Sequence, residues 1–86
     1  MSKRFKKSYI QRMVISEARS IGEFDILYPI QLSSHIFEDL FFDEIGITEL
    51  ILSLEDKFNI KIPDEDIIHL QSIGEIVNII CKLSHT

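Results

Sequence analysis

The chain has 86 residues, 45% of them hydrophobic and 27% charged, which suffices for one domain with a modest core and excludes a disordered chain. No apolar run approaches the ~20 residues that a membrane-spanning helix requires, so no membrane span is expected. The net charge is −5, to which residues 1–12 contribute +5 and the remainder −10. This acidic body argues against nucleic acid as the main partner and favours a basic protein surface.

The cysteine content and the N-terminus both bear on the cellular compartment. Cys81 is the single cysteine, so no disulfide can form within the chain, which fits a reducing environment. We expect Cys81 to be a small buried residue of a helix. The N-terminus is basic but lacks the apolar stretch and cleavage site of a signal peptide. We therefore expect a cytoplasmic protein.

The first predicted helix begins at Ser8, a candidate N-cap, and ends near Arg19 or Ser20, because Gly22 is a natural helix stop. Apolar residues recur in it at offsets of three and four, which is typical of a helix with one buried face. These residues are Ile10, Met13, Val14, Ala18 and Ile21.

Residues 23–36 form a long and unusually apolar connection, in which Pro29 argues against a continuous helix. A loop with this many apolar side chains should pack across the helix ends and not remain in water. The apolar side chains are Phe24, Ile26, Leu27, Tyr28, Ile30 and Leu32.

The second predicted helix begins just after Asp43, whose side chain is a good N-cap. Asn59 follows its end and tolerates the left-handed conformation of a helix C-cap. The apolar spacing places five side chains on one face, namely Ile47, Leu50, Ile51, Leu54 and Phe58. The opposite face is polar and carries Glu49, Ser53, Asp56 and Lys57.

A short third helix is predicted after an extended segment in which Ile60 and Ile62 alternate inward. Pro63 suits its first position, and the acids that follow suit its positive end. We expect three side chains after it to face the core: Ile67, Ile68 and Leu70.

Ser72 and Glu75 match a capping box, which predicts the start of a last helix. Its apolar stripe comprises Ile73, Ile76, Val77, Ile80 and Leu83, widened by Ile79. Periodicity alone therefore predicts a small helical bundle with essentially no sheet.

Four short motifs make this sequence resemble the acyl carrier protein family. The family pattern is an acidic-Leu-Gly-x-Asp-Ser-Leu segment, a helix ending in an acidic run and Phe, and then Ile-Pro-Asp-Glu. The matching residues are Glu38-Asp39-Leu40, Asp43-Glu44-Ile45, Leu54-Glu55-Asp56-Lys57-Phe58 and Ile62-Pro63-Asp64-Glu65, without a gap from Ile36 to Ile80. The resemblance implies an all-α fold, a small four-helix bundle of three main helices and one short helix with a long first loop. We expect residues 8–84 to form this single domain after a flexible basic segment, residues 1–7.

One departure from the family pattern decides the functional argument: Glu44 stands where the family has the serine that carries the 4'-phosphopantetheine arm. Attachment needs an alcohol oxygen that attacks phosphorus, and a carboxylate supplies none. No cofactor is therefore expected, and the nearby hydroxyls of Thr48, Ser33 and Ser34 lack the motif. Glu44 is either an acid favoured at a helix N-terminus or a negative charge kept where the phosphodiester would lie. A third alternative is an engineered substitution.

Phe41 and Phe42 are a second departure, because the family commonly has Gly and another small residue there. Two phenyl rings would crowd an arm that leaves the surface at this point. We expect one ring to enter the core and the other to be exposed as a partner anchor.

The leading hypothesis is a protein-binding module without the arm. The resemblance implies that acidic positions meet a basic surface on a partner protein, such as an enzyme of acyl metabolism; the alternative is an ordinary solvated helix face. The predicted partner-binding residues are Asp43, Glu49, Glu55, Asp56, Phe41 and Phe42. A second hypothesis is a genuine carrier in fatty-acid, polyketide or related acyl metabolism with an exceptional Glu44.

The sequence offers no support for an enzyme or a metal site. No nucleophile–base arrangement or paired-carboxylate pattern is evident. The histidines, His35, His69 and His85, lack ligand spacing. We expect a monomer that is not an enzyme and binds no metal.

Overall fold

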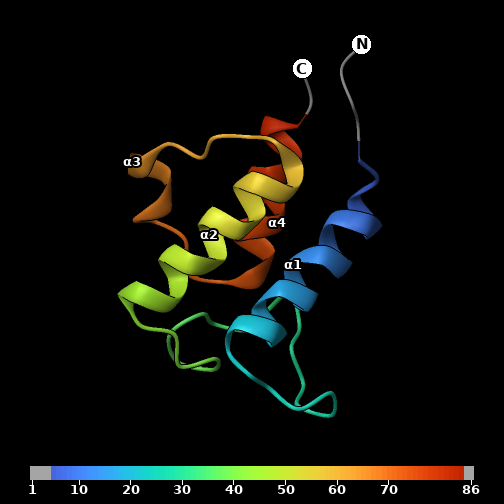
Figure 1. The fold of residues 1–86 in the computed structure, drawn as a ribbon, viewed down its shortest axis with the longest axis vertical. Coiled ribbons are helices and arrows are strands. Elements are labelled where there is room, and N and C mark those ends of the chain that lie inside the picture. Colours follow the sequence, from blue (N-terminus) through green and yellow to red (C-terminus); the bar gives the residue numbers. More distant parts are fainter. Residues whose placement is uncertain (1–4, 85–86) are drawn as a thin grey trace.

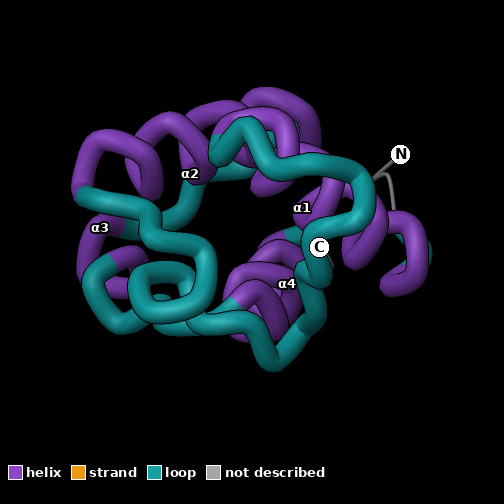
Figure 2. The backbone as a smooth tube through the Cα atoms, turned by 90° about the horizontal axis from the view of Figure 1, so that it is seen from below, coloured by secondary structure: helices purple, strands orange, loops and turns teal. Residues whose placement is uncertain are grey.

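The computed structural model describes residues 5–84, which form an all-α fold of three long helices and one short helix (Figure 1). The helices are α1 (Lys7–Ile21), α2 (Glu44–Phe58), α3 (Asp64–Ile67) and α4 (Ile73–Leu83). Figure 2 shows only helices and loops along the drawn chain. Within the described range, one isolated bridge between His35 and Ser72 is the sole β-type pairing. The predicted fold class is confirmed.

Helix α1 begins one residue earlier than the predicted cap, and Ser8 is inside its first turn. The Ile10 N–H donates to the Lys6 carbonyl oxygen over 3.0 Å, so Lys6 is the N-cap, without a side-chain bond. At the other end Gly22 caps with φ −79°, and Glu23 takes the left-handed conformation at φ 55°. Of the predicted flexible segment, residues 1–4 lie outside the described range. Phe5 packs edge-on against Phe58, with ring centroids 5.0 Å apart.

Helix α2 has the predicted limits. The Gly46 N–H donates to Asp43 Oδ1 over 2.8 Å, so Asp43 is the N-cap. Asn59 ends the helix in the left-handed conformation with φ 54°. The predicted apolar stripe of α2 is buried: Ile47, Leu50, Ile51, Leu54 and Phe58.

The predictions for α3 need two corrections. Pro63 is the N-cap and not the first helical residue, and the helix has only four residues. Ile68 is 76% exposed, whereas Leu70 is buried. After the helix, the Leu70 N–H donates to the Ile67 carbonyl, and this tight turn directs Leu70 inward and Ile68 outward.

The predicted capping box of α4 is present. The Glu75 N–H donates to Ser72 Oγ over 3.2 Å, and the Ser72 N–H donates to Glu75 Oε1 over 3.0 Å. Four residues of its stripe are buried: Ile73, Ile76, Val77 and Ile80. Cys81 is only half-buried, contrary to expectation, because it lies beside the buried stripe.

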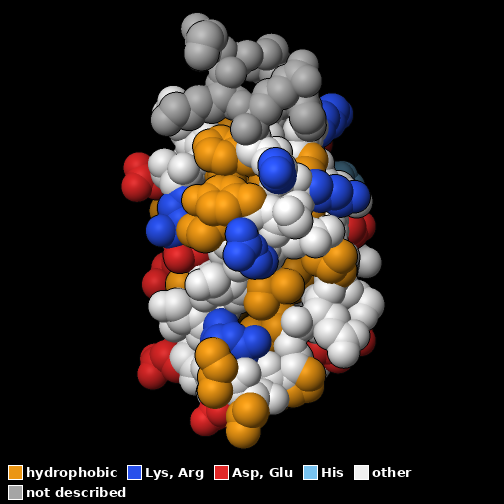
Figure 3. Space-filling model, turned by 90° about the vertical axis from the view of Figure 1, so that its right-hand side faces the viewer, with side chains coloured by type: hydrophobic (Ala, Val, Ile, Leu, Met, Phe, Trp, Pro, Cys, Tyr) orange, Lys and Arg blue, Asp and Glu red, His pale blue; other side chains and the backbone are white. Residues whose placement is uncertain are grey.

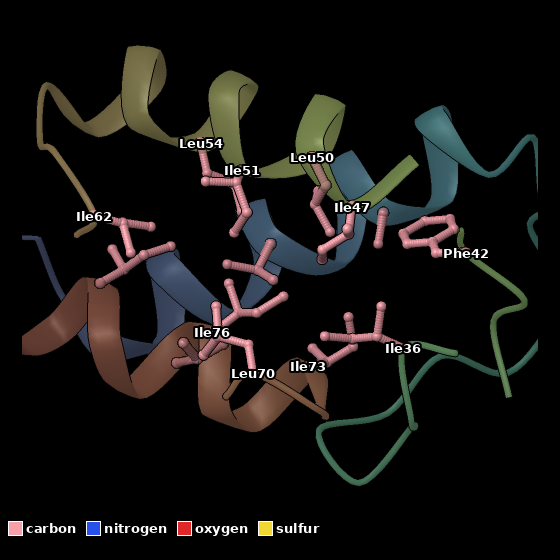
Figure 4. Packing of buried hydrophobic residues seen from close by; sticks show 14 of the residues in the cluster. Ile36, Phe42, Ile47, Leu50, Ile51, Leu54, Ile62, Leu70, Ile73 and Ile76 are labelled. Carbon is pink, nitrogen blue, oxygen red and sulfur yellow. The ribbon is translucent and has the colours of Figure 1, made fainter. Parts of the chain in front are cut away.

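The core lies among α1, α2 and α4, and α1 packs against both other helices. Figure 4 shows Leu50, Ile51 and Leu54 of α2 facing Ile73 and Ile76 of α4. Each fully buried aliphatic side chain contributes about 1.5–3 kcal/mol to the stability of the fold. This core holds the start of α2 at one end of the bundle.

The first loop is only partly packed. Phe24 and Tyr28 stack with centroids 4.6 Å apart and pack against the core, and Ile30 is buried. Ile26 and Leu27, however, are 80% and 87% exposed, contrary to expectation. The two side chains are exposed because they lie in a tight turn whose backbone is held by hydrogen bonds. The Arg19 guanidinium donates to the carbonyls of Asp25 and Tyr28, and the Leu27 N–H donates to Asp25 Oδ1.

Candidate functional site

Glu44 occupies the first position of α2 with its carboxylate exposed to solvent. Nearby hydroxyl groups are engaged in other bonds. The Thr48 hydroxyl donates to the Glu44 carbonyl oxygen over 2.7 Å, and the Ser33 hydroxyl donates to Gln31 Oε1 over 3.4 Å. Ser34 is buried, and its Oγ accepts from the Gln31 N–H. The Glu44 side chain has no alcohol oxygen, so it does not itself fit a group that is attached through one.

Of the two phenylalanines before α2, one is buried and the other is exposed, as predicted. Phe42 is 8% exposed and packs against Phe24, with ring centroids 6.4 Å apart. Phe41 is 73% exposed, and its backbone is left-handed with φ 60°. A residue with a side chain adopts that conformation at a cost, which explains why glycine suits this position in the family pattern.

The acidic residues of α2 divide into two groups. Glu49 and Asp56 are exposed. Glu55 is half-buried, and its carboxylate accepts a hydrogen bond from the Ile62 N–H over 2.7 Å. The expectation that Glu55 lies on the exposed side is therefore wrong, because its carboxylate holds the segment that follows α2. We use "acidic strip" for Glu49 and Asp56 alone.

Exposed apolar side chains on and near α2 escaped the sequence prediction. Ile45 is 71% exposed, and Leu52 and Ile68 are also largely exposed. Ile45 and Leu52 are seven residues apart, so they lie two turns apart on nearly one line of the helix. Both residues fall outside the buried stripe of α2. Their positions relative to that stripe could have predicted from the sequence that they are exposed.

A pocket of about 520 Å³ lies between the end of α1 and the start of α2. Its apolar lining includes Phe41, Phe42 and Ile45, and its acidic lining consists of Asp43 and Glu49. The pocket is open to solvent, so it is a surface depression and not an enclosed cavity. No sequence pattern indicates this pocket, because its walls come from two elements that only the fold brings together.

One of the three histidines, His35, has a local structural role. The Nδ1 atom of His35 accepts hydrogen bonds from the N–H groups of Phe37 and Glu38, so this ring caps a turn. His85 lies outside the described range. In residues 5–84, no group of three or more side chains is arranged to hold a metal ion. Across the same residues, the helices are too short or too polar to cross a bilayer.

A small bundle with a long first loop and an acid-capped second helix is the architecture of carrier proteins. The family model described as "Phosphopantetheine attachment site" matches residues 25–80. An acyl carrier protein of Campylobacter lari is 38% identical over 72 residues, covering 84% of this chain and 88% of the relative. One of Campylobacter concisus is 44% identical over 54 residues, covering 63% and 70%.

Solved structures agree with these matches. A candidate acyl carrier protein from Mycobacterium tuberculosis superimposes with a TM-score of 0.75 at 25% identity, covering 80% of this chain and 90% of that one. An acyl carrier protein from Thermotoga maritima has the same fold, with a TM-score of 0.68 at 23% identity, covering 86% and 89%. The chain belongs to the acyl carrier protein family, whose members normally carry 4'-phosphopantetheine and act as carriers and not as enzymes.

Proposed function

We propose that this chain is a carrier-protein-like binding module that lacks the phosphopantetheine arm and is not an enzyme. The observation that carries the proposal is the exposed Glu44 carboxylate at the first position of α2. The hydroxyl of Thr48, one turn further along the helix, is bonded to the backbone and does not replace the missing serine.

The partner surface in this proposal combines charge with an apolar anchor. The acidic strip and Asp43 attract a partner with a basic surface, such as an enzyme of acyl metabolism, and thereby speed association. Phe41 supplies apolar contact area that slows dissociation. Phe42 supports this surface from within the core, and the Glu55 carboxylate stabilises the segment after α2 by accepting from the Ile62 N–H.

The proposal also covers the setting in which the protein acts. We place it in the cytoplasm as a monomer, supported by the single Cys81 and by the acidic net charge of −5, which opposes self-association. Nucleic acid is not a partner in this proposal.

The second candidate is a genuine carrier, which the match to the phosphopantetheine family model favours. Co-expression with a broad-specificity phosphopantetheinyl transferase, followed by intact-mass measurement, separates the two. We expect the mass of the unmodified chain. A mass increase of one arm, located by peptide mapping, would establish the carrier instead.

A further inference from the structure

Three features at the start of α2 are unfavourable for an isolated folded chain, and all three lie around one pocket. Phe41 has a side chain in a left-handed backbone conformation. Ile45 exposes most of an aliphatic side chain. Gly46 lies within a helix, where glycine is a poor former. Departures from local rules that coincide at one place indicate a functional constraint.

The fold itself does not require glycine at position 46. A Cβ atom there would meet Asp43 Oδ1 at 3.4 Å and the ring of Phe42 at 3.6 Å, which are ordinary contacts. Gly22, on the other side of the pocket, is different. A Cβ there would come within 2.7 Å of the Phe24 ring and 2.9 Å of the Phe42 ring. Gly22 therefore lets the two rings form the inner wall, whereas the missing side chain of Gly46 leaves the pocket open.

The pocket combines apolar walls with carboxylates that have no cation beside them. The side chains that line it include no Lys or Arg. Asp43 uses Oδ1 for the helix cap, and the Glu49 carboxylate has no hydrogen-bond or ion-pair partner in residues 5–84. A neutral apolar occupant would remove these carboxylates from water without compensation. An occupant with an aliphatic stem and a terminal cation can pack its stem against the apolar walls and pair its charge with the carboxylates.

We propose that this pocket receives an arginine side chain of the basic partner protein, an inference that rests on the proposed function. The arginine stem packs between Phe41 and Ile45, and the guanidinium faces Glu49 and Asp43. Arginine fits better than lysine, because its planar guanidinium can stack on the exposed Phe41 ring while it donates to a carboxylate. Phe41 is thus one wall of a receptor pocket as well as an exposed anchor.

The probe for this pocket is n-butylguanidinium, titrated into the 15N-labelled protein and followed by amide chemical shifts. We expect saturable shifts at Phe41, Ile45 and Gly46, with about tenfold weaker binding of 1-pentanol, which has a stem but no charge. Free guanidinium, which has the charge but no stem, should bind about tenfold more weakly as well.

Two variants remove the pocket without changing its charge. Gly46→Leu fills it, and Phe41→Gly removes one wall while keeping a residue that accepts the left-handed conformation. Each should weaken butylguanidinium binding about tenfold or more. The control is Ile68→Ala, which removes an exposed apolar side chain that does not line the pocket and should change the affinity for the probe by less than about twofold. Circular dichroism of each variant establishes that it is folded, and the Phe41→Gly arm stands if Gly46→Leu does not fold.

Two results would contradict the proposal that the pocket binds an arginine side chain. Equal affinity for butylguanidinium and pentanol overturns the cation preference, and unchanged binding in both folded variants overturns the location. Different results would contradict the proposed function: loading of the chain by a transferase, or a partner whose affinity does not change when the acidic strip is reversed. Gly46→Leu changes the pocket but leaves the charge of the acidic strip unchanged. A failure of the pocket proposal can therefore be distinguished from a failure of the proposed function.

Discussion

At the residue scale, Phe41 holds a backbone conformation that favours glycine. Phe41 keeps the left-handed backbone, with φ 60°, although its ring is 73% exposed and gains little from burial. A left-handed residue with a side chain costs about 1–2 kcal/mol relative to its preferred conformation. Phe41 therefore lowers the stability of the isolated chain, which is consistent with a role in binding a partner.

Phe41→Gly should stabilise the fold. Relief of the backbone strain outweighs the extra chain entropy of glycine in the unfolded state, so the free energy of unfolding should rise by about 0.5–1 kcal/mol. Urea denaturation followed by circular dichroism measures this change. Phe42→Gly is the contrast, because loss of a buried ring should destabilise by about 3–5 kcal/mol. A fall in stability for Phe41→Gly would mean that the exposed ring makes net favourable contacts.

The same residue should govern modification at position 44. A Glu44→Ser variant should be loaded poorly by a phosphopantetheinyl transferase, because the Phe41 ring crowds the approach to the helix start. Phe42 is buried and should not contribute to this crowding. Adding Phe41→Gly should raise the loading rate about tenfold, measured by intact mass over time. Adding Leu27→Ala, at an exposed apolar residue in the first loop, should leave the rate unchanged. Efficient loading of Glu44→Ser alone would contradict the steric argument.

At the element scale, the helices that local signals define were predicted well. Asp43, Asn59 and the Ser72–Glu75 box each act through neighbours within four residues, so the sequence contains the whole cap. The sequence could not show that Glu55 binds the Ile62 backbone, because that contact depends on how the chain turns after α2. The four-residue α3 and the turn that exposes Ile68 likewise depend on tertiary packing, which overrides weak local preference.

Replacing the α2 cap should affect stability more than replacing its neighbour. Asp43→Ala removes the acceptor of the Gly46 N–H and should lower the free energy of unfolding by about 0.5–2 kcal/mol. Glu44→Ala removes only an exposed first-turn charge and should cost about 0.3–1 kcal/mol at low salt. Denaturant curves at low and high salt separate the two effects, since only the second is screened strongly. Equal losses for the two variants at high salt would contradict the capping role of Asp43.

At the scale of the whole molecule, charge is distributed unevenly. Figure 3 shows basic side chains around apolar ones on the face that α1 covers, with acidic side chains toward the edges. Helix α1 exposes Lys7 and Arg12, and its N-cap residue Lys6 is also exposed. The one acid of α1, Glu17, pairs with Lys57 of α2 over 3.5 Å. Exposed basic side chains are therefore concentrated at α1, whereas the exposed acids of the acidic strip lie on α2. Under the proposed function, this distribution orients a partner with a basic surface toward α2.

Reversing the acidic strip tests this orientation. The double variant Glu49→Lys with Asp56→Lys should slow association with the true partner about tenfold, and should change dissociation less, because rim charges act mainly on encounter. Raising the salt concentration should slow association of the wild-type chain in the same way. Stopped-flow or surface-plasmon measurements give both rate constants.

A matched double variant separates the local strip from the overall charge. Glu23→Lys with Glu38→Lys makes the same change in net charge at two exposed residues of the first loop. It should slow association less than the strip variant, because each charge acts most strongly within a Debye length of about 8–10 Å. If both variants slow association equally, only net charge matters. If neither does, the strip is an ordinary solvated helix face. The binding surface would then be sought in the first loop around Tyr28, where Ile30 is buried and the accessible apolar neighbours are Ile26 and Leu27.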